Sequence, residues 1–350
     1  MKHFLLALAL ALALLIAACA PAAVGPSSAT PQASPSATPF PVEAVTFIAG
    51  FKPQADLPFV GVYVAQERGY FKTQGLDVTI QHAVSGEHVQ LVATNRAQFS
   101  TGTGGDIIKR VSQADVPLVS IAVIGQRDDQ AFAVRADSPI KTPKDWEGRL
   151  VGYKSTPSAD YLALLKIAGV DRSKVREVAV GFDPRVLATG QVDVYPVFAA
   201  NEPDTLARQG IPVRLIDPTA FGIPSFGLTY MTNREMVTTR PQVVKRFLRA
   251  ALKGIEDAIA DRDGAIDIVM KYAPGEDRAH QRYMLDTEII AAQNDMTKAR
   301  GIGAMTKEQW ATLESFLSEY NAIPKRVDVA SLYNDMFVNE LYQSGKLVWP

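Results

Sequence analysis

The chain has 350 residues, and its 36 basic and 37 acidic side chains leave no basic field that would attract a nucleic acid. An apolar content of 47% and a charged content of 21% are those of a soluble globular protein. The single cysteine, Cys19, excludes an intramolecular disulfide. The roughly 300 residues beyond the N-terminal segment exceed what one small core usually covers, so we expect two lobes.

The chain begins with a segment typical of bacterial lipoprotein export signals. Lys2 precedes an apolar run over residues 4–16 that is too short to span a bilayer, and Ile16-Ala17-Ala18-Cys19 matches the small-residue pattern at which such signals are cut. We predict a signal peptide over residues 1–18, lipidation of Cys19 with palmitate-type chains, and anchoring at the extracytoplasmic face of the cell membrane. The alternative for Cys19 is a free surface thiol. Residues 19–43, rich in Ala, Pro, Ser and Thr, are predicted to form a tether.

Beyond the tether, short apolar runs alternate with amphipathic stretches. Strands are predicted over 45–51, 76–80, 99–101, 116–124, 131–134, 150–153, 192–198 and 228–231, and the first intervening helices over 61–68 and 88–94. This alternation predicts parallel strands in α/β sheets covered on both faces. Apolar positions at spacings of three and four predict a helical C-terminal third, over 241–259, 264–272, 277–292, 306–320 and 329–341.

Ligands of open α/β sheets bind at the carboxyl ends of the strands, so the turns after four predicted strands supply the candidate site. Aromatic and hydrogen-bonding side chains gather in and beside these turns, a mixture that suits an uncharged aromatic molecule. The predicted ligand-binding residues are Phe51, Gln54, Phe59, Tyr63, Thr103, Gly104, Tyr153, Ser155, Thr156, Tyr195, Asn201 and Glu202, with Phe226 as a further aromatic candidate.

Several of these residues have a structural alternative. Phe51 and Phe59 would serve equally as core or lid residues, and Glu202, next to a proline at a helix start, would also complement the helix N-terminus. The glycine turn at 101–106 matches neither a Walker loop nor a dinucleotide fingerprint. His82 and His88 are too isolated for a metal centre, and no G-x-S-x-G nucleophile elbow is present. We therefore expect no metal, no cofactor and no enzymatic activity.

Several motifs resemble the thiamine-precursor (pyrimidine) type of substrate-binding protein of ABC importers. They are Tyr63-Val64-Ala65, Gly69-Tyr70-Phe71, Gly75-Leu76-Asp77-Val78, Asp145-Trp146-Glu147-Gly148, Gly190-Gln191-Val192-Asp193-Val194 and Asn201-Glu202-Pro203, within a likeness over about residues 44–290. The resemblance implies a two-lobed periplasmic-binding-protein fold of type II with a hinge, lobe 1 comprising 44–125 and 233–350 and lobe 2 comprising 126–232. It further implies a monomer that delivers its ligand to a cognate ABC permease.

The turn after the first strand departs from the pyrimidine-binding pattern. That pattern reads Trp-x-Pro-Asn followed shortly by His, whereas this chain has Phe51-Lys52-Pro53-Gln54 and no histidine before Phe59. The departure would suit a larger flat ring, and riboflavin-binding lipoproteins resemble this chain, so we predict riboflavin as the ligand, with a thiamine pyrimidine precursor as the alternative. A pyrimidine synthase, an exported hydrolase and a metabolite sensor are the alternatives from other classes.

Overall fold

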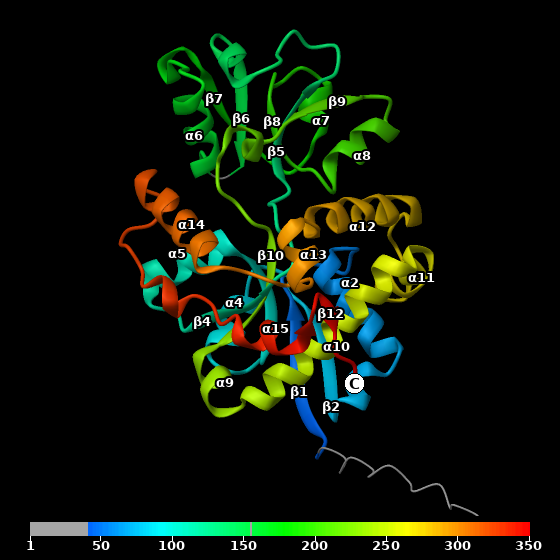
Figure 1. Cartoon of the computed structure of the whole chain (residues 1–350). Helices are drawn as coiled ribbons and strands as arrows, with labels where there is room; N and C mark the ends of the chain where they lie inside the picture. The colour runs from blue at the N-terminus through cyan, green and yellow to red at the C-terminus, as the bar shows by residue number, and fades with distance from the viewer. Residues whose placement is uncertain (1–40, 155) are drawn as a thin grey trace, which may run out of the picture. The chain divides into compact units, whose positions relative to one another are not determined.

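The computed structural model describes residues 41–154 and 156–350, which lie in one compact unit that runs from Phe40 to Pro350. The predictions for the signal peptide, for Cys19 and for the tether up to residue 40 lie outside the described residues. Within the described part of the chain, no helix combines the length and the apolar character that crossing a bilayer requires. Two α/β lobes stand one above the other in Figure 1, as the sequence predicted.

The first lobe is built on a five-stranded sheet in the order β2-β1-β3-β10-β4. The strand β1 pairs in parallel with β2 and β3, whereas β10 runs antiparallel to β3 and β4. The strands are β1 (Glu43–Ala49), β2 (Leu76–His82), β3 (Phe99–Thr103), β4 (Leu118–Val123) and β10 (Leu228–Asn233).

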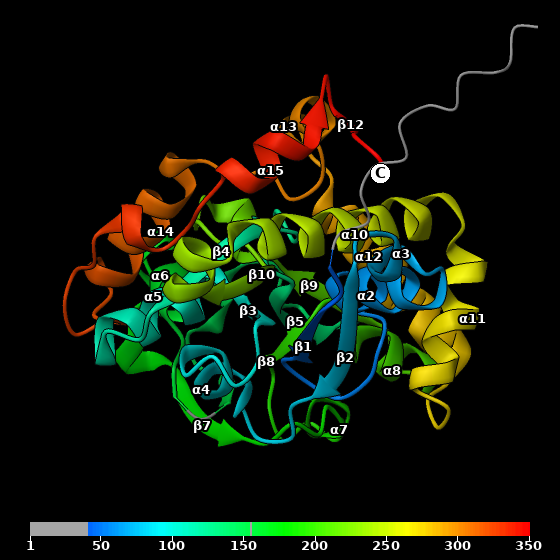
Figure 2. The same cartoon turned by 90° about the horizontal axis from the view of Figure 1, so that it is seen from below.

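Helices cover both faces of this sheet (Figure 2). On one face Phe247 of α10 stacks on Phe99 with ring centroids 3.9 Å apart, inside a large apolar core. On the other face Met231 and Trp310 belong to a second core. The helices of this lobe are α2 (Leu57–Glu67), α3 (Tyr70–Thr73), α4 (His88–Ala93), α5 (Gly104–Ala114), α9 (Arg234–Thr239), α10 (Pro241–Ala260), α11 (Arg262–Tyr272), α12 (Arg278–Ala292), α13 (Asp295–Arg300), α14 (Lys307–Glu319) and α15 (Met336–Leu341), followed by the hairpin β11 (Tyr342–Gln343) and β12 (Lys346–Leu347).

The second lobe contains a three-stranded sheet in the order β8-β5-β9 and a parallel pair, β6 and β7, which a bridge between Val151 and Val194 joins to it. Trp146 stacks on Tyr161 in its core, with ring centroids 5.9 Å apart. Its strands are β5 (Gln130–Arg135), β6 (Leu150–Lys154), β7 (Arg176–Val180), β8 (Tyr195–Phe198) and β9 (Val213–Ile216), and its α-helices are α6 (Ala159–Ile167), α7 (Arg185–Ala188) and α8 (Glu202–Arg208).

Four predictions about the fold need correction. The sheets are mixed and not wholly parallel, because β4 leaves the first lobe and β10 returns to it in the opposite direction. The boundary predicted at residue 232 is wrong for the same reason, since β10 pairs within the first lobe. The tether cannot extend to residue 43, because β1 begins at Glu43. The helix predicted over 329–341 is a 3-10 turn, Val329–Ser331, and the separate helix α15.

Candidate ligand-binding site between the lobes

Two chain crossings lie side by side between the lobes. One joins β4 to β5 through residues 124–129, and the other leads into β10 through Gly227. Gly227 N–H donates to the Gly125 carbonyl at 2.8 Å, and Gly125 N–H donates to the Leu228 carbonyl at 3.0 Å. A Cβ atom on Gly125 would lie 3.0 Å from the Gly227 Cα atom, so the close approach requires glycine. The paired crossings form the hinge of the two-lobed fold.

Gln126 anchors the first crossing to the first lobe. Its side-chain amide donates to the carbonyls of Val123 and Ala304 at 2.8 and 2.9 Å, and its backbone N–H donates to Ala291 at the end of α12 at 3.0 Å. Gln126 is 6% exposed, so its polar groups are satisfied by protein atoms and not by bulk water. These hydrogen bonds fix the start of the first crossing to the first lobe.

Helices begin at the carboxyl ends of β1, β3, β6 and β8, as the strand-end rule predicts. Thr103 caps α5 by accepting from Asp106 N–H, and Ser158 caps α6 by accepting from Tyr161 N–H. Each of these helices also carries a carboxyl group at its start: Asp56 before α2, Asp106 in α5, Asp160 in α6 and Glu202 in α8. The carboxyl groups offset the positive ends of the helix dipoles.

Further carboxyl groups lie between the lobes, from the hinge and from α12. Burial raises the pKa of Asp129 well above its usual range, and the negative charges of Glu288, Asp128 and Asp56 add to the effect. Burial and the charge of Asp56 likewise raise the pKa of Glu288. The pKa of Asp160 rises to about 7 through burial and the charge of Asp128, against the opposing effect of Lys109. A carboxyl group both donates and accepts hydrogen bonds when it is protonated, and only accepts them when it is ionised.

The second lobe contributes a pocket with a cation in its wall. Lys154 Nζ lies 2.8 Å from Glu202 Oε1 and 4.8 Å from the ring centroid of Phe198, and Glu202 Oε2 accepts from Phe198 N–H at 2.8 Å. Phe182 and Tyr195 also face the ammonium group, with centroids at 5.1 and 5.4 Å. The pocket is lined by Gln130, Ala131, Phe132, Tyr153, Lys154, Thr156, Ser158, Asp160, Tyr161, Pro196, Val197, Phe198 and Pro218.

The predicted ligand-binding residues do not all lie in one place. Tyr153 and Thr156 line the pocket of the second lobe, whereas Phe51, 53% exposed, and Gln54 lie in the loop between β1 and α2. Gln54 donates to the Asp56 carboxyl group at 3.0 Å. Ser155 lies outside the described residues.

Three predicted aromatic contacts are corrected because their side chains are buried. Phe59 is 1% exposed within the large core of the first lobe, and Tyr63 stacks on Tyr272 at 4.1 Å and hydrogen-bonds to His82. Tyr195 is fully buried, and its hydroxyl donates to the Gly181 carbonyl at 2.9 Å. These rings stabilise the lobes and leave no face for a ligand.

Five further candidates have structural partners. Gly104 lies so close to Phe226 that a Cβ atom would be 1.9 Å from its ring, and Thr103 serves as the helix cap described above. Phe226 itself is 3% exposed and packs edge-to-face against Trp310. Glu202 is held by Lys154, and Asn201 Oδ1 lies 3.0 Å from His280 Nε2 of α12.

Sequence reasoning missed Lys154, Asp160, Glu288 and His280. The pair Asp128-Asp129, directly before a predicted strand, could have indicated acidic groups at the hinge. The four missed residues could not be found in this way, because their contacts depend on the tertiary fold. Within residues 41–154 and 156–350, no group of three histidine, cysteine or acidic residues is arranged to hold a metal ion.

Two lobes, a paired hinge and an interlobe face lined by helix starts define the architecture of a type II periplasmic binding protein. Similarity to solved structures supports this fold: the aliphatic sulphonate binding protein SsuA from Escherichia coli aligns with a TM-score of 0.64 at 16% identity, over 83% of this chain and 91% of that protein. The model of the NMT1/THI5-like family matches residues 57–265, and the chain belongs to that family.

Two curated relatives align over most of the chain. One is the riboflavin-binding protein RibY of Chloroflexus aurantiacus, 27% identical over 329 residues, which cover 89% of this chain and 92% of the relative. The other is the formylaminopyrimidine-binding protein of Halalkalibacterium halodurans, 26% identical over 296 residues, which cover 82% and 88% of the two chains. Both are named for binding a small nitrogen heterocycle.

Proposed function

We propose that this chain binds riboflavin between its lobes for uptake through an ABC permease, as a lipid-anchored protein on the extracytoplasmic face of the membrane. The similarity to RibY across nearly the whole of both chains carries the choice of riboflavin. The composition of the interlobe region supports it. Phe51 is exposed in the loop after β1 of the first lobe, while Phe182 and Phe198 flank Lys154 on the second, so each lobe has exposed aromatic rings that could stack on a flat ligand.

Carboxyl groups with raised pKa values suit the polar edges of riboflavin. Its ring system has carbonyl and imino groups, and its ribityl chain has hydroxyls, so it offers both donors and acceptors. The carboxyl group of Asp160, whose pKa burial raises to about 7, donates a hydrogen bond when protonated and accepts one in either state. Lys154 is engaged by Glu202, so its charge is balanced before a ligand arrives.

The same features disfavour an anionic ligand. A bound anion gains from the unsatisfied N–H groups and positive dipole at a helix start. Here Asp56 precedes α2, Asp160 lies in the first turn of α6, and Glu202 begins α8 beside Lys154, so each of these three helix starts already has a carboxyl group. We therefore expect riboflavin to bind and flavin mononucleotide, which adds a phosphate, to bind at least 10-fold more weakly.

The test is a titration of the chain from residue 20 onward, which contains the whole compact unit from Phe40 to Pro350. Flavin fluorescence should be quenched saturably by the protein at micromolar or lower concentration, with flavin mononucleotide as the charged comparison. Equal affinities would refute the charge argument while leaving flavin binding intact. Absence of quenching with both flavins would refute the assignment of riboflavin.

The second candidate is a thiamine pyrimidine precursor, because the formylaminopyrimidine-binding relative is nearly as similar. An amino group on the pyrimidine would donate to Asp160 or to another carboxyl group in the pocket of the second lobe. A thermal shift with formylaminopyrimidine but not with riboflavin would select this ligand. The lipid anchor is tested separately, since Cys19→Ser should abolish incorporation of labelled palmitate and release the protein from membranes.

A further inference from the structure

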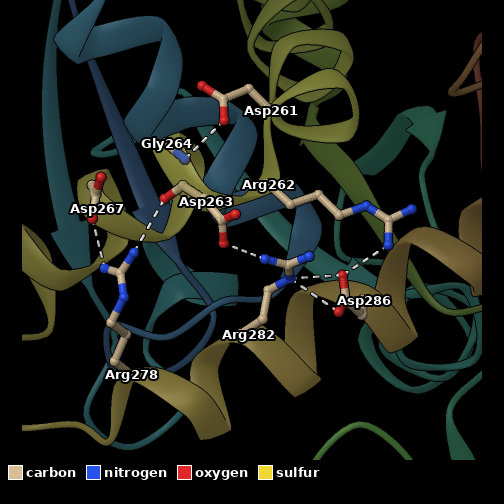
Figure 3. A network of polar contacts seen from close by, with 8 residues as sticks. All are labelled: Asp261, Arg262, Asp263, Gly264, Asp267, Arg278, Arg282 and Asp286. Atoms are coloured by element: carbon tan, nitrogen blue, oxygen red, sulfur yellow. Dashed lines mark hydrogen bonds and ion pairs between the residues drawn. The ribbon is translucent and has the colours of Figure 1, made fainter.

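Helix α12 presents three different faces. Its apolar face, including Met284, Leu285 and Ile289, is buried in the first lobe. A second face carries Arg278, Arg282 and Asp286 at spacings of four, which meet α11 in the ion-pair network of Figure 3. The third face carries His280 and Tyr283 and meets the second lobe.

The network of Figure 3 joins α12 to α11 within the first lobe. Arg278 Nη1 lies 2.6 Å from Asp267, Arg262 Nη1 lies 2.9 Å from Asp286, and Arg282 joins Asp263 to Asp286. Individually such exposed pairs contribute little, but several charges in a network fix side chains and helices more firmly. At its other end α12 is tied to the hinge, because the Ala291 carbonyl accepts from Gln126 N–H.

Across the lobe boundary, His280 is held by two residues at the start of α8. Its Nδ1 atom lies 2.7 Å from Asp204 Oδ2, and its Nε2 atom lies 3.0 Å from the side-chain amide of Asn201. The side chains of His280 and Asp204 are only 14% and 15% exposed, so water competes weakly for this hydrogen bond. Burial opposes ionisation of Asp204, but hydrogen bonds from Arg208 and His280 outweigh it and lower its pKa.

Two further contacts join the same surfaces. The Tyr283 hydroxyl donates to the Ala199 carbonyl at 2.9 Å, and Arg208 Nη1 lies 3.5 Å from Asp277, the N-cap residue of α12. All of these partners lie on opposite sides of the hinge, so a rotation that separates α8 from α12 breaks them together.

We propose that α12 is a latch that holds the lobes closed, with His280 as the positioning residue that fixes Asn201 and Asp204. The latch stabilises the closed arrangement without a ligand and therefore slows ligand release. Asn201, which the sequence suggested as a ligand contact, acts here through closure. A charge-assisted hydrogen bond of this kind changes an equilibrium by about 10-fold or more when it is removed.

The experiment measures closure without ligand. Nitroxide labels at Gln90→Cys and Gln191→Cys, one exposed position in each lobe, report the interlobe distance in the chain from residue 20 onward, which lacks Cys19. We expect His280→Ala to shift the distance distribution of the empty protein toward longer distances and to accelerate riboflavin release about 10-fold. His280→Gln, which keeps a donor for Asp204, should restore part of the closed population.

Arg282→Ala is the matched control, since it removes ion pairs of the same helix that face α11 and not the second lobe. The control should leave the distance distribution unchanged. Identical distributions for the unsubstituted protein and His280→Ala would overturn the latch, and so would equal shifts for His280→Ala and Arg282→Ala. Because the distance measurement needs no ligand, either result leaves the proposed riboflavin function standing.

Discussion

A Phe59→Ala substitution tests whether Phe59 is a core residue or a ligand contact. Phe59 is 1% exposed and packs in the large core of the first lobe. Removing a phenyl ring from such a site costs about 3–5 kcal/mol, because apolar contacts are lost and a cavity remains. For a folded unit of roughly 300 residues, this free energy corresponds to a fall in melting temperature of about 5–8 °C.

The comparison variant is Phe198→Ala, which removes a ring that is 38% exposed at the pocket of the second lobe. This ring contributes about 0.5–1 kcal/mol through its contact with the Lys154 ammonium group, so the melting temperature should fall by only a degree or two. Loss of a stacked ring weakens binding by about 1.5 kcal/mol, or about 10-fold in the dissociation constant of riboflavin.

The assay combines thermal unfolding of the empty protein with flavin titration of both variants. Phe59→Leu serves as a control, since it keeps most of the apolar volume and should recover most of the lost stability. A Phe59→Ala variant that melts like the unsubstituted protein and binds riboflavin weakly would place Phe59 against the ligand and refute its assignment to the core.

Three further predictions concern the hinge and the charges between the lobes. Gly125→Ala should lower the melting temperature by several degrees in a thermal scan, because the added methyl would lie 3.0 Å from the Gly227 Cα atom. Lys154→Met should lower the free energy of unfolding, measured by denaturant titration, by about 3 kcal/mol, because it leaves the buried Glu202 without its cation. Combining Lys154→Met with Glu202→Gln should recover part of that loss. Asp160→Asn should stabilise the protein at pH 8 and have little effect at pH 4. The folded-state pKa of Asp160, about 7, lies above its unfolded value, so the favourable contribution of its neutral form is present below pH 4 and is lost as the pH rises through 7. Melting curves in which Asp160→Asn stabilises the protein more at pH 4 than at pH 8 would contradict this prediction.

Much of the fold could be predicted because local patterns determine it. The apolar spacing in α10 and α14 and the alternation of strands and helices located most elements within a few residues. Strand direction was beyond that reasoning, because β10 is antiparallel only as a result of where the chain re-enters the first lobe. A periodicity of two residues is the same in parallel and antiparallel strands.

The predicted aromatic contacts were harder to assign than the strands and helices that contain them. Phe59 and Tyr63 follow the first strand, where a ligand was expected, but the helix that contains them is buried at every position from Leu57 to Ala65. A helix that is apolar all round lies in a core, so its aromatic residues face protein and not ligand. The continuous apolar run of α2 was visible in the sequence and would have separated these two residues from Phe51. The Lys154–Glu202 pair, by contrast, joins residues 48 positions apart and depends on the tertiary fold alone.

The fold alone does not determine the charge of the ligand that it binds. The same two-lobed architecture occurs in a protein named for binding aliphatic sulphonates, which are anions, and in this chain the helix starts between the lobes carry Asp56, Asp106, Asp160 and Glu202. An ionised carboxyl group at a helix N-terminus stabilises that helix by roughly 0.3–1 kcal/mol, although at Asp160 burial outweighs this contribution and raises the pKa. The same carboxyl group interacts with the positive end of the helix dipole, which would otherwise be available to an anionic ligand. Local helix stabilisation and the proposed selection of an uncharged ligand therefore have one physical origin, and replacing the helix-start carboxyl group of Asp106 by its amide should change both together.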